Sequence, residues 1–345
     1  MLNTLYNTLF KYSGTPKTFF APGRVNLIGE HTDHEGGYVF PCAIEYGISA
    51  LASTNQFGSF RIFSSNFDDP QLEQPFVIDY QDIRKAKIDV NRSWVNYPLG
   101  VVHTLMEHGY SLPKGVDILF SGNLPQGAGL SSSAAIEVLT VYIFSELLGL
   151  NINGVEAAKL AQEAENSFIG VHCGIMDQFA VSLGKKNNAI LLNCSTLDYS
   201  YVPLNLTSCK IILANSNVPH SLADSEYNLR RSQCEEALRN IQRVKDINYL
   251  CELSTLELDE YAYTINDPVV LKRARHVVSE NARAMRAAKA LQSGDLAMFG
   301  RLMNASHVSL RDDYQVTIPE LDLLADLAWH FKGVWGARMT GGGFG

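Results

Sequence analysis

Pro125-Gln-Gly-Ala-Gly-Leu-Ser-Ser-Ser-Ala-Ala135 joins a glycine-rich turn, a run of serines and the start of a helix. Gly127 and Gly129 permit positive φ angles and a close approach of the backbone to a ligand. The N–H groups that follow have no intrahelical partner and can point at an anion. Residues 134–148 are apolar almost all round, which predicts a buried helix. The stretch therefore predicts a phosphate site, although an ordinary helix start would look the same.

The same stretch excludes two better-known nucleotide motifs. No Gly-Lys-Ser/Thr follows the glycines, so this is not a Walker A loop and it offers no lysine to the phosphates. Ser132 stands where the third glycine of a dinucleotide-binding fingerprint would be.

The composition is that of a globular protein with large cores. The chain has 345 residues, of which 46% are hydrophobic, and this predicts two domains. A formal net charge of -8 argues against a nucleic-acid partner. No apolar stretch is long enough to span a membrane, and the first residues lack signal-peptide features. The six cysteines have no metal-binding or disulfide spacing, so we expect reduced thiols in a cytoplasmic protein.

Residues up to about 204 alternate between strand-like and helical patterns, and the remainder is mostly helical. Aromatic and β-branched residues predict strands at 37–52, 57–64, 116–121, 189–194, 199–204 and 210–215. Apolar residues at helical spacing predict helices at 94–108, 134–148, 157–168, 234–241, 271–285 and 321–328. We therefore expect an α+β architecture with one domain over 1–204 and a second over 205–345.

A second chemical cluster lies between glycines near the N-terminus, over residues 21–33. It combines Arg24, Glu30, His31 and Asp33. Carboxylates accept hydrogen bonds from sugar hydroxyls, and arginine supplies a permanent cation for phosphate. A polyhydroxy ligand would fit this set, while a polar turn before a strand is the alternative.

Two further carboxylates lie in or near the glycine-punctuated segment 170–178. Asp177 follows Ile175 and Met176, where partial burial could suit it to proton abstraction or hydroxyl binding, although a helix cap is the alternative. Glu165 borders the apolar face of the helix predicted at 157–168. It would be paired with a cation or bound to a metal, or would lie at the edge of the surface.

The chain ends in three consecutive glycines after Thr340, within Gly336-Ala-Arg-Met-Thr-Gly-Gly-Gly-Phe-Gly345. Such a run can wrap closely around a ligand, and a flexible terminus would look the same.

Taken in order, four motifs resemble those of galactokinases within the GHMP small-molecule kinases. They are GRVNLIGEHTD at 23–33, LPQGAGLSSSAA at 124–135, GIMDQ at 174–178 and ARMTGGGFG at 337–345. The first is specific to the galactokinase branch, whereas LSSSAA alone indicates the wider superfamily. The resemblance covers nearly the whole chain. It implies a two-domain α+β GHMP fold, each domain a mixed or antiparallel sheet with helices, and an active site in the cleft between them.

The resemblance implies ATP-dependent phosphorylation of α-D-galactose at its C1 hydroxyl, by a cytoplasmic enzyme. Asp177 matches the catalytic aspartate, and Arg24 matches the arginine that stabilises developing negative charge. The residues that match sugar-binding positions are Glu30, His31, Asp33, Gly174 and Tyr227.

The resemblance also implies an ATP site and a Mg²⁺ site. The residues that match the phosphate loop are Gly127, Ala128, Gly129, Leu130, Ser131, Ser132 and Ser133. Ser133 and Glu165 match magnesium positions, and Ser64 and Trp94 lie near the family's nucleotide-base contacts. Without a Walker lysine, the phosphate charge would be offset by Mg²⁺, the helix dipole and Arg24.

Two departures from the family pattern stand out. His34 replaces the tyrosine that usually follows EHTD, and the chain stops at Gly345, where family members continue with strand sequence. We therefore expect an incomplete C-terminal domain, and a truncated galactokinase whose activity is open. The alternatives are an inactive truncation product, a kinase for a related sugar, and a non-catalytic sugar and ATP sensor. Ser133-Ala134, which such sensors lack, is intact and favours an enzyme. We expect galactose and ATP as substrates, no nucleic-acid or membrane partner, and a monomer.

Overall fold

The computed structural model describes residues 2–11, 13–66, 74–89, 93–125, 129–206, 209–218 and 223–345. The chain divides into two compact units, each discontinuous in sequence. Unit 1 comprises 1–23, 44–126 and 131–183, and unit 2 comprises 24–43, 127–130 and 184–345. The division into domains over 1–204 and 205–345 stays a prediction.

Unit 1 is built on a five-stranded mixed sheet in the order β1-β3-β6-β4-β5. The strands are β1 (Lys17–Asn26), β3 (Pro41–Asn55), β4 (Ser59–Ser64), β5 (Phe76–Asp79) and β6 (Gly115–Gly122). β6 pairs antiparallel with β3 and parallel with β4, so that Ile118 lies opposite Ala52 and Ile62. All three side chains are buried, because alternate residues of each strand face the same core.

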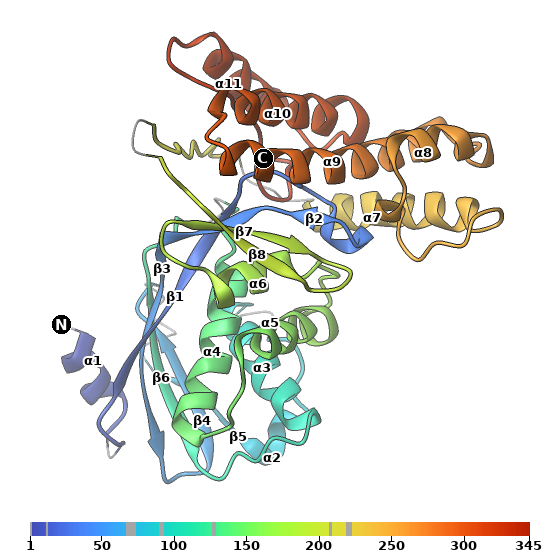
Figure 1. Cartoon of the computed structure of the whole chain (residues 1–345). Helices are drawn as coiled ribbons and strands as arrows, with labels where there is room; N and C mark the ends of the chain where they lie inside the picture. Colours follow the sequence, from blue (N-terminus) through green and yellow to red (C-terminus); the bar gives the residue numbers. More distant parts are fainter. Residues whose placement is uncertain are drawn as a thin grey trace. The chain divides into compact units, whose positions relative to one another are not determined.

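Helices pack against this sheet and complete the core of unit 1 (Figure 1). They are α3 (Asn96–Glu107), α4 (Ser132–Leu148), α5 (Gly154–Glu163) and α6 (Met176–Leu183), with the shorter α1 (Leu2–Leu9) and α2 (Tyr80–Ile83). α4 contacts α3, α5 and α6, which explains why its sequence is apolar almost all round. The predicted helix at 157–168 is confirmed, but its last part, Ala164–Ile169, is a π-helix.

Unit 2 combines a small antiparallel sheet with a layer of helices. Its sheet has the order β2-β7-β8, with β2 (Tyr38–Val39), β7 (Asn188–Asn193) and β8 (Tyr199–Pro203). The helices are α7 (Ala223–Ile241), α8 (Thr255–Tyr261), α9 (Pro268–Gln292), α10 (Leu296–Ser309) and α11 (Pro319–His330). The α+β class and the sheet types that the sequence predicted are confirmed.

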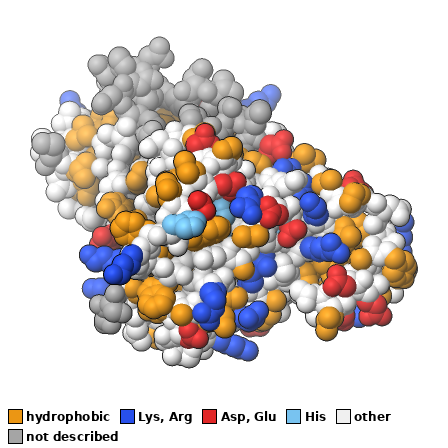
Figure 2. All heavy atoms as spheres, turned by 90° about the horizontal axis from the view of Figure 1, so that it is seen from above, with side chains coloured by type: hydrophobic (Ala, Val, Ile, Leu, Met, Phe, Trp, Pro, Cys, Tyr) orange, Lys and Arg blue, Asp and Glu red, His pale blue; other side chains and the backbone are white. Residues whose placement is uncertain are grey.

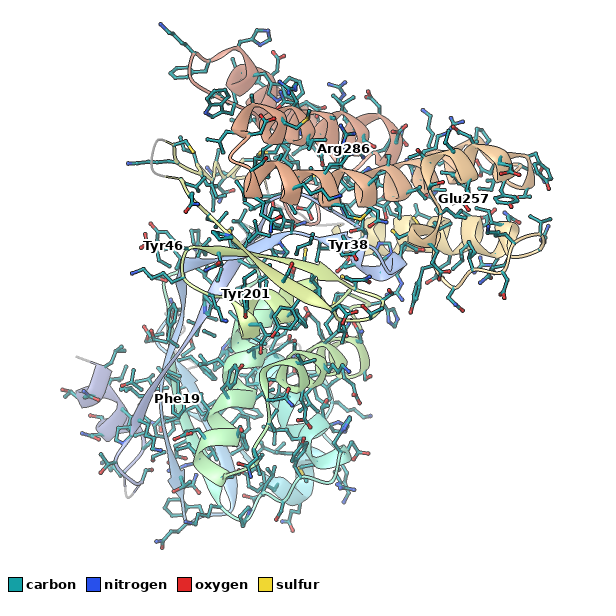
Figure 3. The ribbon with its side chains drawn as sticks, in the orientation of Figure 1. Phe19, Tyr38, Tyr46, Tyr201, Glu257 and Arg286 are labelled. Carbon is teal, nitrogen blue, oxygen red and sulfur yellow. The ribbon has the colours of Figure 1, made fainter. Side chains whose placement is uncertain are left out.

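The long helix α9 is the centre of unit 2, since it contacts α7, α8, α10, β2 and β8 (Figure 1). Pro268 begins it, and the side chain of Asp267 caps it by accepting a hydrogen bond from Val269 N at 2.7 Å. The Asn281 side chain of α9 accepts a hydrogen bond from the Tyr38 backbone of β2 at 2.8 Å. Figure 3 labels Tyr38 on β2 and Arg286 on the same helix.

One predicted element is wrong. Residues 210–215, expected to form an apolar strand, are irregular, and Ile212 is 85% exposed. Among the described residues, no strand pairs with this segment. A strand is stable when its backbone groups and one apolar face are satisfied by neighbours, and the apolar composition of 210–215 does not supply them.

Charged side chains of both signs are found on one face of the molecule (Figure 2). On the face drawn in Figure 2, basic and acidic side chains are interspersed, in keeping with the net charge of -8. Within the described ranges, no helix combines the length and the apolar character needed to cross a membrane.

Candidate active site

The phosphate loop is described from Gly129 onward, and Gly127 and Ala128 lie outside the described residues. Gly129 has a φ of 64°, as the sequence predicted for its glycines, and Ser131 has a φ of 60°. Leu130 and Ser131 are buried, Ser133 is half-buried and Ser132 is exposed at the start of α4. No side chain caps this helix, so its first N–H groups keep their capacity to bind an anion.

The Ser131 side chain turns to the predicted catalytic aspartate instead of capping α4. Its hydroxyl donates to Asp177 Oδ2 at 2.6 Å. Asp177 is half-buried in the first turn of α6, and its backbone neighbours Met176 and Gln178 are buried. Gly174 is buried in the loop that precedes α6. Ser131 of the predicted loop and Asp177 of the GIMDQ motif therefore meet within unit 1.

Three carboxylates, which we call the acid cluster, gather in unit 1: Glu137 of α4, Glu165 of the π-helix and Asp177. Gln178 Nε2 donates to Glu165 Oε2 at 2.5 Å and more weakly to Glu137 Oε2 at 3.4 Å. Oε1 of Glu137 is buried and has no hydrogen-bond partner. A neutral amide is thus shared between two buried acids.

Burial is the main reason that the pKa values of Glu137 and Glu165 are raised. The charge of Glu165 raises the pKa of Glu137 further, and the charge of Asp177 does the same for Glu165. Hydrogen bonds from Cys173, Ser133 and Gln178 partly oppose the shift at Glu165. Both predicted magnesium positions, Ser133 and Glu165, therefore lie within hydrogen-bonding reach of each other.

The donor set of this cluster suits Mg²⁺. The hydroxyl of Ser133 and the carboxylate of Glu165 are hard oxygen ligands, and the buried negative charge would be stabilised by a cation. Among the described residues, no group of three or more His, Cys, Asp or Glu side chains is arranged to hold a metal ion.

The predicted sugar turn lies in unit 2, between β1 and β2. His31 is buried in a left-handed conformation, with a φ of 60°. Its ring packs on Tyr314 at 4.7 Å and on the predicted sugar residue Tyr227 at 5.5 Å between centroids. His31 Nε2 is buried without a hydrogen-bond partner, and Asp33 is half-buried in the next turn. An unusual backbone angle and an unpaired buried nitrogen are typical of a functional turn.

Glu280 of α9 binds the backbone of the sugar turn. Its Oε1 accepts the backbone N–H groups of Gly29 and Glu30 at 2.9 and 3.3 Å, and its Oε2 accepts Arg283 Nε at 2.6 Å. Although burial opposes ionisation, Arg283, His276, Arg338 and a hydrogen bond from Ser306 lower the pKa of Glu280 from 4.5 to about 2. The carboxylate is therefore ionised and serves the turn as a fixed acceptor.

Arg24 and Glu30 are both buried in unit 2, and each is tied to a glycine motif. Arg24 Nη1 donates to the carbonyl oxygen of Gly129 in the phosphate loop at 2.7 Å. Glu30 Oε1 accepts Arg338 Nη2 at 2.8 Å, from the glycine-rich end of the chain. Arg24 lies in unit 2 and Asp177 in unit 1, and their catalytic roles stay predictions.

The predicted base contacts, Ser64 and Trp94, line one small pocket of unit 1. Ser64 ends β4, and Trp94 lies in the short helix Ser93–Val95 with its ring edge-on to Phe120 at 6.2 Å. The pocket is also lined by Ile62, Phe63, Gln74, Phe76 and Val95. The lining is mostly apolar with a few polar groups, and the role of Ser64 and Trp94 as base contacts stays a prediction.

Sequence reasoning missed four residues that shape these sites: Glu137, Gln178, Glu280 and Arg338. A carboxylate inside the apolar run 134–148 was a signal for Glu137, and the arginine beside the terminal glycines was one for Arg338. Glu280 and Gln178 carry no comparable local signal, because their roles depend on partners far away in the sequence.

The chain is similar to known protein families and to individual proteins. Residues 4–54 match the galactokinase galactose-binding signature, 96–185 the GHMP kinases N terminal domain and 287–345 the GHMP kinases C terminal family. The galactokinase of Clostridium acetobutylicum is 53% identical over 345 residues, covering 100% of this chain and 87% of that protein. The Bacillus subtilis galactokinase is 45% identical over 344 residues with the same coverage.

Solved structures show the same relationship. Lactococcus lactis galactokinase complexed with galactose aligns with a TM-score of 0.95 and 43% identity, covering 100% of this chain and 87% of that one. Methanococcus jannaschii mevalonate kinase, at 17% identity and a TM-score of 0.60, shares the fold. With two sequence relatives and a solved structure each matched over the full chain, this protein belongs to the galactokinase family of the GHMP kinases.

Proposed function

We propose that this chain catalyses ATP-dependent phosphorylation of α-D-galactose at the C1 hydroxyl, giving galactose 1-phosphate. The observation that carries the proposal is that one chain, 53% identical to a galactokinase, contains both the His31–Tyr227 ring contact and the Ser131–Asp177 hydrogen bond. The similar galactokinase that was solved with galactose supports the same substrate.

Asp177 acts on the sugar hydroxyl. The C1 oxygen forms a bond to the γ-phosphorus of ATP as the bond to ADP breaks, and the hydroxyl proton passes to the Asp177 carboxylate. Alternatively, Asp177 orients the hydroxyl while its proton leaves late. The 2.6 Å hydrogen bond from Ser131 fixes the carboxylate in either case. Arg24 stabilises the negative charge that develops on the phosphates.

The phosphate loop, from Gly127 to Ser133, receives the ATP phosphates on backbone N–H groups at the start of α4. Ser133 and Glu165 hold Mg²⁺, which neutralises phosphate charge when bound. The raised pKa of Glu165 supports this role, because a site that disfavours its own negative charge gains most from a cation. Ser64 and Trp94 contact the nucleotide base in their pocket.

The sugar turn binds galactose through Glu30, His31 and Asp33, with Tyr227 against the His31 ring and Gly174 as a further contact. The unpaired Nε2 of His31 supports this assignment, because a ligand hydroxyl would satisfy it. A reducing cytoplasmic compartment suits the six cysteines, all of which are free thiols. The chain acts as a monomer.

A sugar panel tests the proposal. Purified protein is incubated with ATP and Mg²⁺ and with galactose, glucose, N-acetylgalactosamine or no sugar, and ADP release is followed. We expect release that depends on galactose. Folded protein that binds galactose and ATP but releases no ADP would contradict the enzyme and favour the sensor. A preference for N-acetylgalactosamine would instead revise the substrate.

A further inference from the structure

Three residues of unit 2 converge on one buried oxygen of Glu30, and with Glu30 they form what we call the glycine-loop clamp: Arg338, Thr340 and Gly341. Glu30 Oε1 accepts hydrogen bonds from Arg338 Nη2 at 2.8 Å, Thr340 Oγ1 at 3.1 Å and Gly341 N at 2.8 Å. The side chains of Glu30 and Arg338 are each 2% exposed. Water therefore does not compete for this ion pair, which is held in one geometry.

Arg338 has a second set of partners in the backbone of the sugar motif. Its Nε donates to Leu27 O at 2.7 Å, and its Nη2 also bonds to Asn26 O. Thr340 Oγ1 reaches the same Asn26 carbonyl at 3.0 Å. A lysine carries its three donors on one nitrogen and cannot make all the bonds of this planar fork. The guanidinium thus fixes both the Glu30 carboxylate and the chain that leads into the sugar turn.

The other side of the clamp meets the phosphate loop. A Cβ added to Gly341 would lie 3.4 Å from the carbonyl oxygen of Gly129, and one added to Gly129 would lie 4.0 Å from Thr340 O. Gly341 and Gly129 have φ values of 88° and 64°, so a larger residue would strain both loops. Arg24 donates to the same Gly129 oxygen at 2.7 Å. One series of contacts in unit 2 thus runs from the sugar turn to the phosphate loop.

The second carboxylate oxygen of Glu30 can accept a further hydrogen bond. Oε2 accepts one hydrogen bond, from Asn26 Nδ2 at 2.8 Å, and a carboxylate oxygen can accept a further one. A sugar hydroxyl could take that place while Oε1 keeps its three donors.

We propose that Arg338 is a positioning residue that sets the affinity for both substrates, because it holds Glu30 between the sugar turn and the loop that packs on Gly129. This inference rests on the proposed function for the identity of the two ligands. A single buried guanidinium would then act on galactose through Glu30 and on the ATP phosphates through Gly341 and Gly129.

Calorimetry on the full chain tests the role of Arg338. Dissociation constants are measured for galactose and for a non-hydrolysable ATP analogue with Mg²⁺, in the wild type, Arg338→Gln, Arg338→Lys and Arg61→Gln. Arg61 is the matched control, because it forms a buried pair with Asp117 in unit 1 at 2.6 Å and 16% side-chain exposure. We expect Arg338→Gln to weaken both ligands about tenfold or more, with partial rescue by lysine, and Arg61→Gln to change neither.

The binding stoichiometry separates positioning from a structural role. A structural loss would lower the fraction of competent protein and leave both dissociation constants unchanged, which would overturn the inference. Weakened galactose binding alone would also overturn it, since the link to the phosphate loop would be absent. If Arg338→Gln does not fold, Thr340→Val removes one donor from Oε1, and we expect both ligands to weaken about threefold. Unchanged constants in that variant would overturn the inference.

The results that would contradict the proposed function differ from those that would contradict the role of Arg338. A wild-type chain that binds both ligands without turnover contradicts the kinase, while the effect of Arg338→Gln on both constants still decides the inference. A wild-type chain that binds neither ligand overturns both.

Discussion

Two pairs of buried carboxylates, one pair in each unit, have different hydrogen-bond partners. In unit 2, Glu280 is paired with Arg283 and Glu30 with Arg338, and the pKa of Glu280 falls to about 2. In unit 1, Glu137 and Glu165 share the neutral amide of Gln178, and their pKa values are raised. Across the described part of the chain, no lysine or arginine pairs with either of them.

The two pairs of acids differ in how their charge is compensated. A buried carboxylate beside a protein cation keeps its charge, whereas one without a cation raises the free energy of the folded state when it ionises. Glu30 and Glu280 are paired with arginines in unit 2 and fix the sugar turn. Glu137 and Glu165 have no such partner among the described residues, which suits Glu165 to the role proposed for Mg²⁺.

The largest expected effect is at Asp177, the acid whose proposed partner is the substrate itself. Asp177→Ala removes the acceptor for the C1 proton, so kcat should fall about 10²- to 10⁴-fold while galactose affinity stays close to that of the wild type. Steady-state kinetics and calorimetry give the two quantities. Asp198→Ala, at an exposed position, is the control, and an Asp177→Ala enzyme with near-normal kcat would remove Asp177 from its role.

Glu280→Gln should destabilise the folded protein, because it removes a compensated charge from beneath the sugar turn. The pKa of Glu280 is depressed from 4.5 to about 2, so its contribution is complete above pH 4.5 and is lost as the pH falls toward 2. We expect a loss of about 3 kcal/mol at pH 7 that shrinks below pH 4.5, measured by urea denaturation. Exposed Glu236→Gln should change little, and a loss that is independent of pH would contradict the ionised carboxylate.

Glu165→Gln should raise the Mg²⁺ concentration needed for half-maximal activity about tenfold, because an amide is a weaker ligand for a hard cation than a carboxylate. The galactose KM should not move. Glu163→Gln is the matched control, two residues away and exposed, with His108 as its partner. Identical Mg²⁺ dependence in the two variants would show that Glu165 is not a ligand.

Glu137→Gln should stabilise the folded protein, whereas Glu280→Gln destabilises it, and this is the smallest of the expected effects. The pKa of Glu137 is raised, so its contribution to stability is present below pH 4.5 and is lost as the pH rises through the folded value. A glutamine side chain at position 137 does not ionise, so the variant does not lose this stability, and we expect its Tm at pH 8 to rise by roughly 2–4 °C. Calorimetry with exposed Glu146→Gln as the control tests this, and a lower Tm would show that Glu137 stabilises the fold as a charge.

The helices predicted from apolar periodicity correspond to α3, α4, α5, α7, α9 and α11, because that periodicity reflects local packing, whereas α10 was not predicted. α4 and α9 follow their predicted stripes closely. β1 was not predicted, because Pro22 and Gly23 interrupt its strand pattern and make the stretch look like a turn. The strand expected at 210–215 was wrong, since composition does not reveal whether a neighbouring strand is present.

The candidate site was predictable where short motifs carry it and not where distant residues complete it. Ser131 and Asp177 could be named from their motifs, but their 2.6 Å hydrogen bond joins residues 46 apart. The Glu30–Arg338 pair spans 308 positions, so no local pattern could relate the two. Whether a buried acid has a cation beside it depends on such long-range contacts, which is why the contrast between the units emerges from the structure.

Phosphorus-31 NMR of the reaction tests the central claim most directly. Wild-type protein is mixed with galactose, ATP and Mg²⁺, and the same mixture is run without Mg²⁺ and with Asp177→Ala. The account predicts that a sugar 1-phosphate signal grows as the γ-phosphate signal of ATP declines, in the complete wild-type mixture and not in the other two. Folded wild-type protein that gives no such signal, or the same rate with Asp177→Ala, would contradict it.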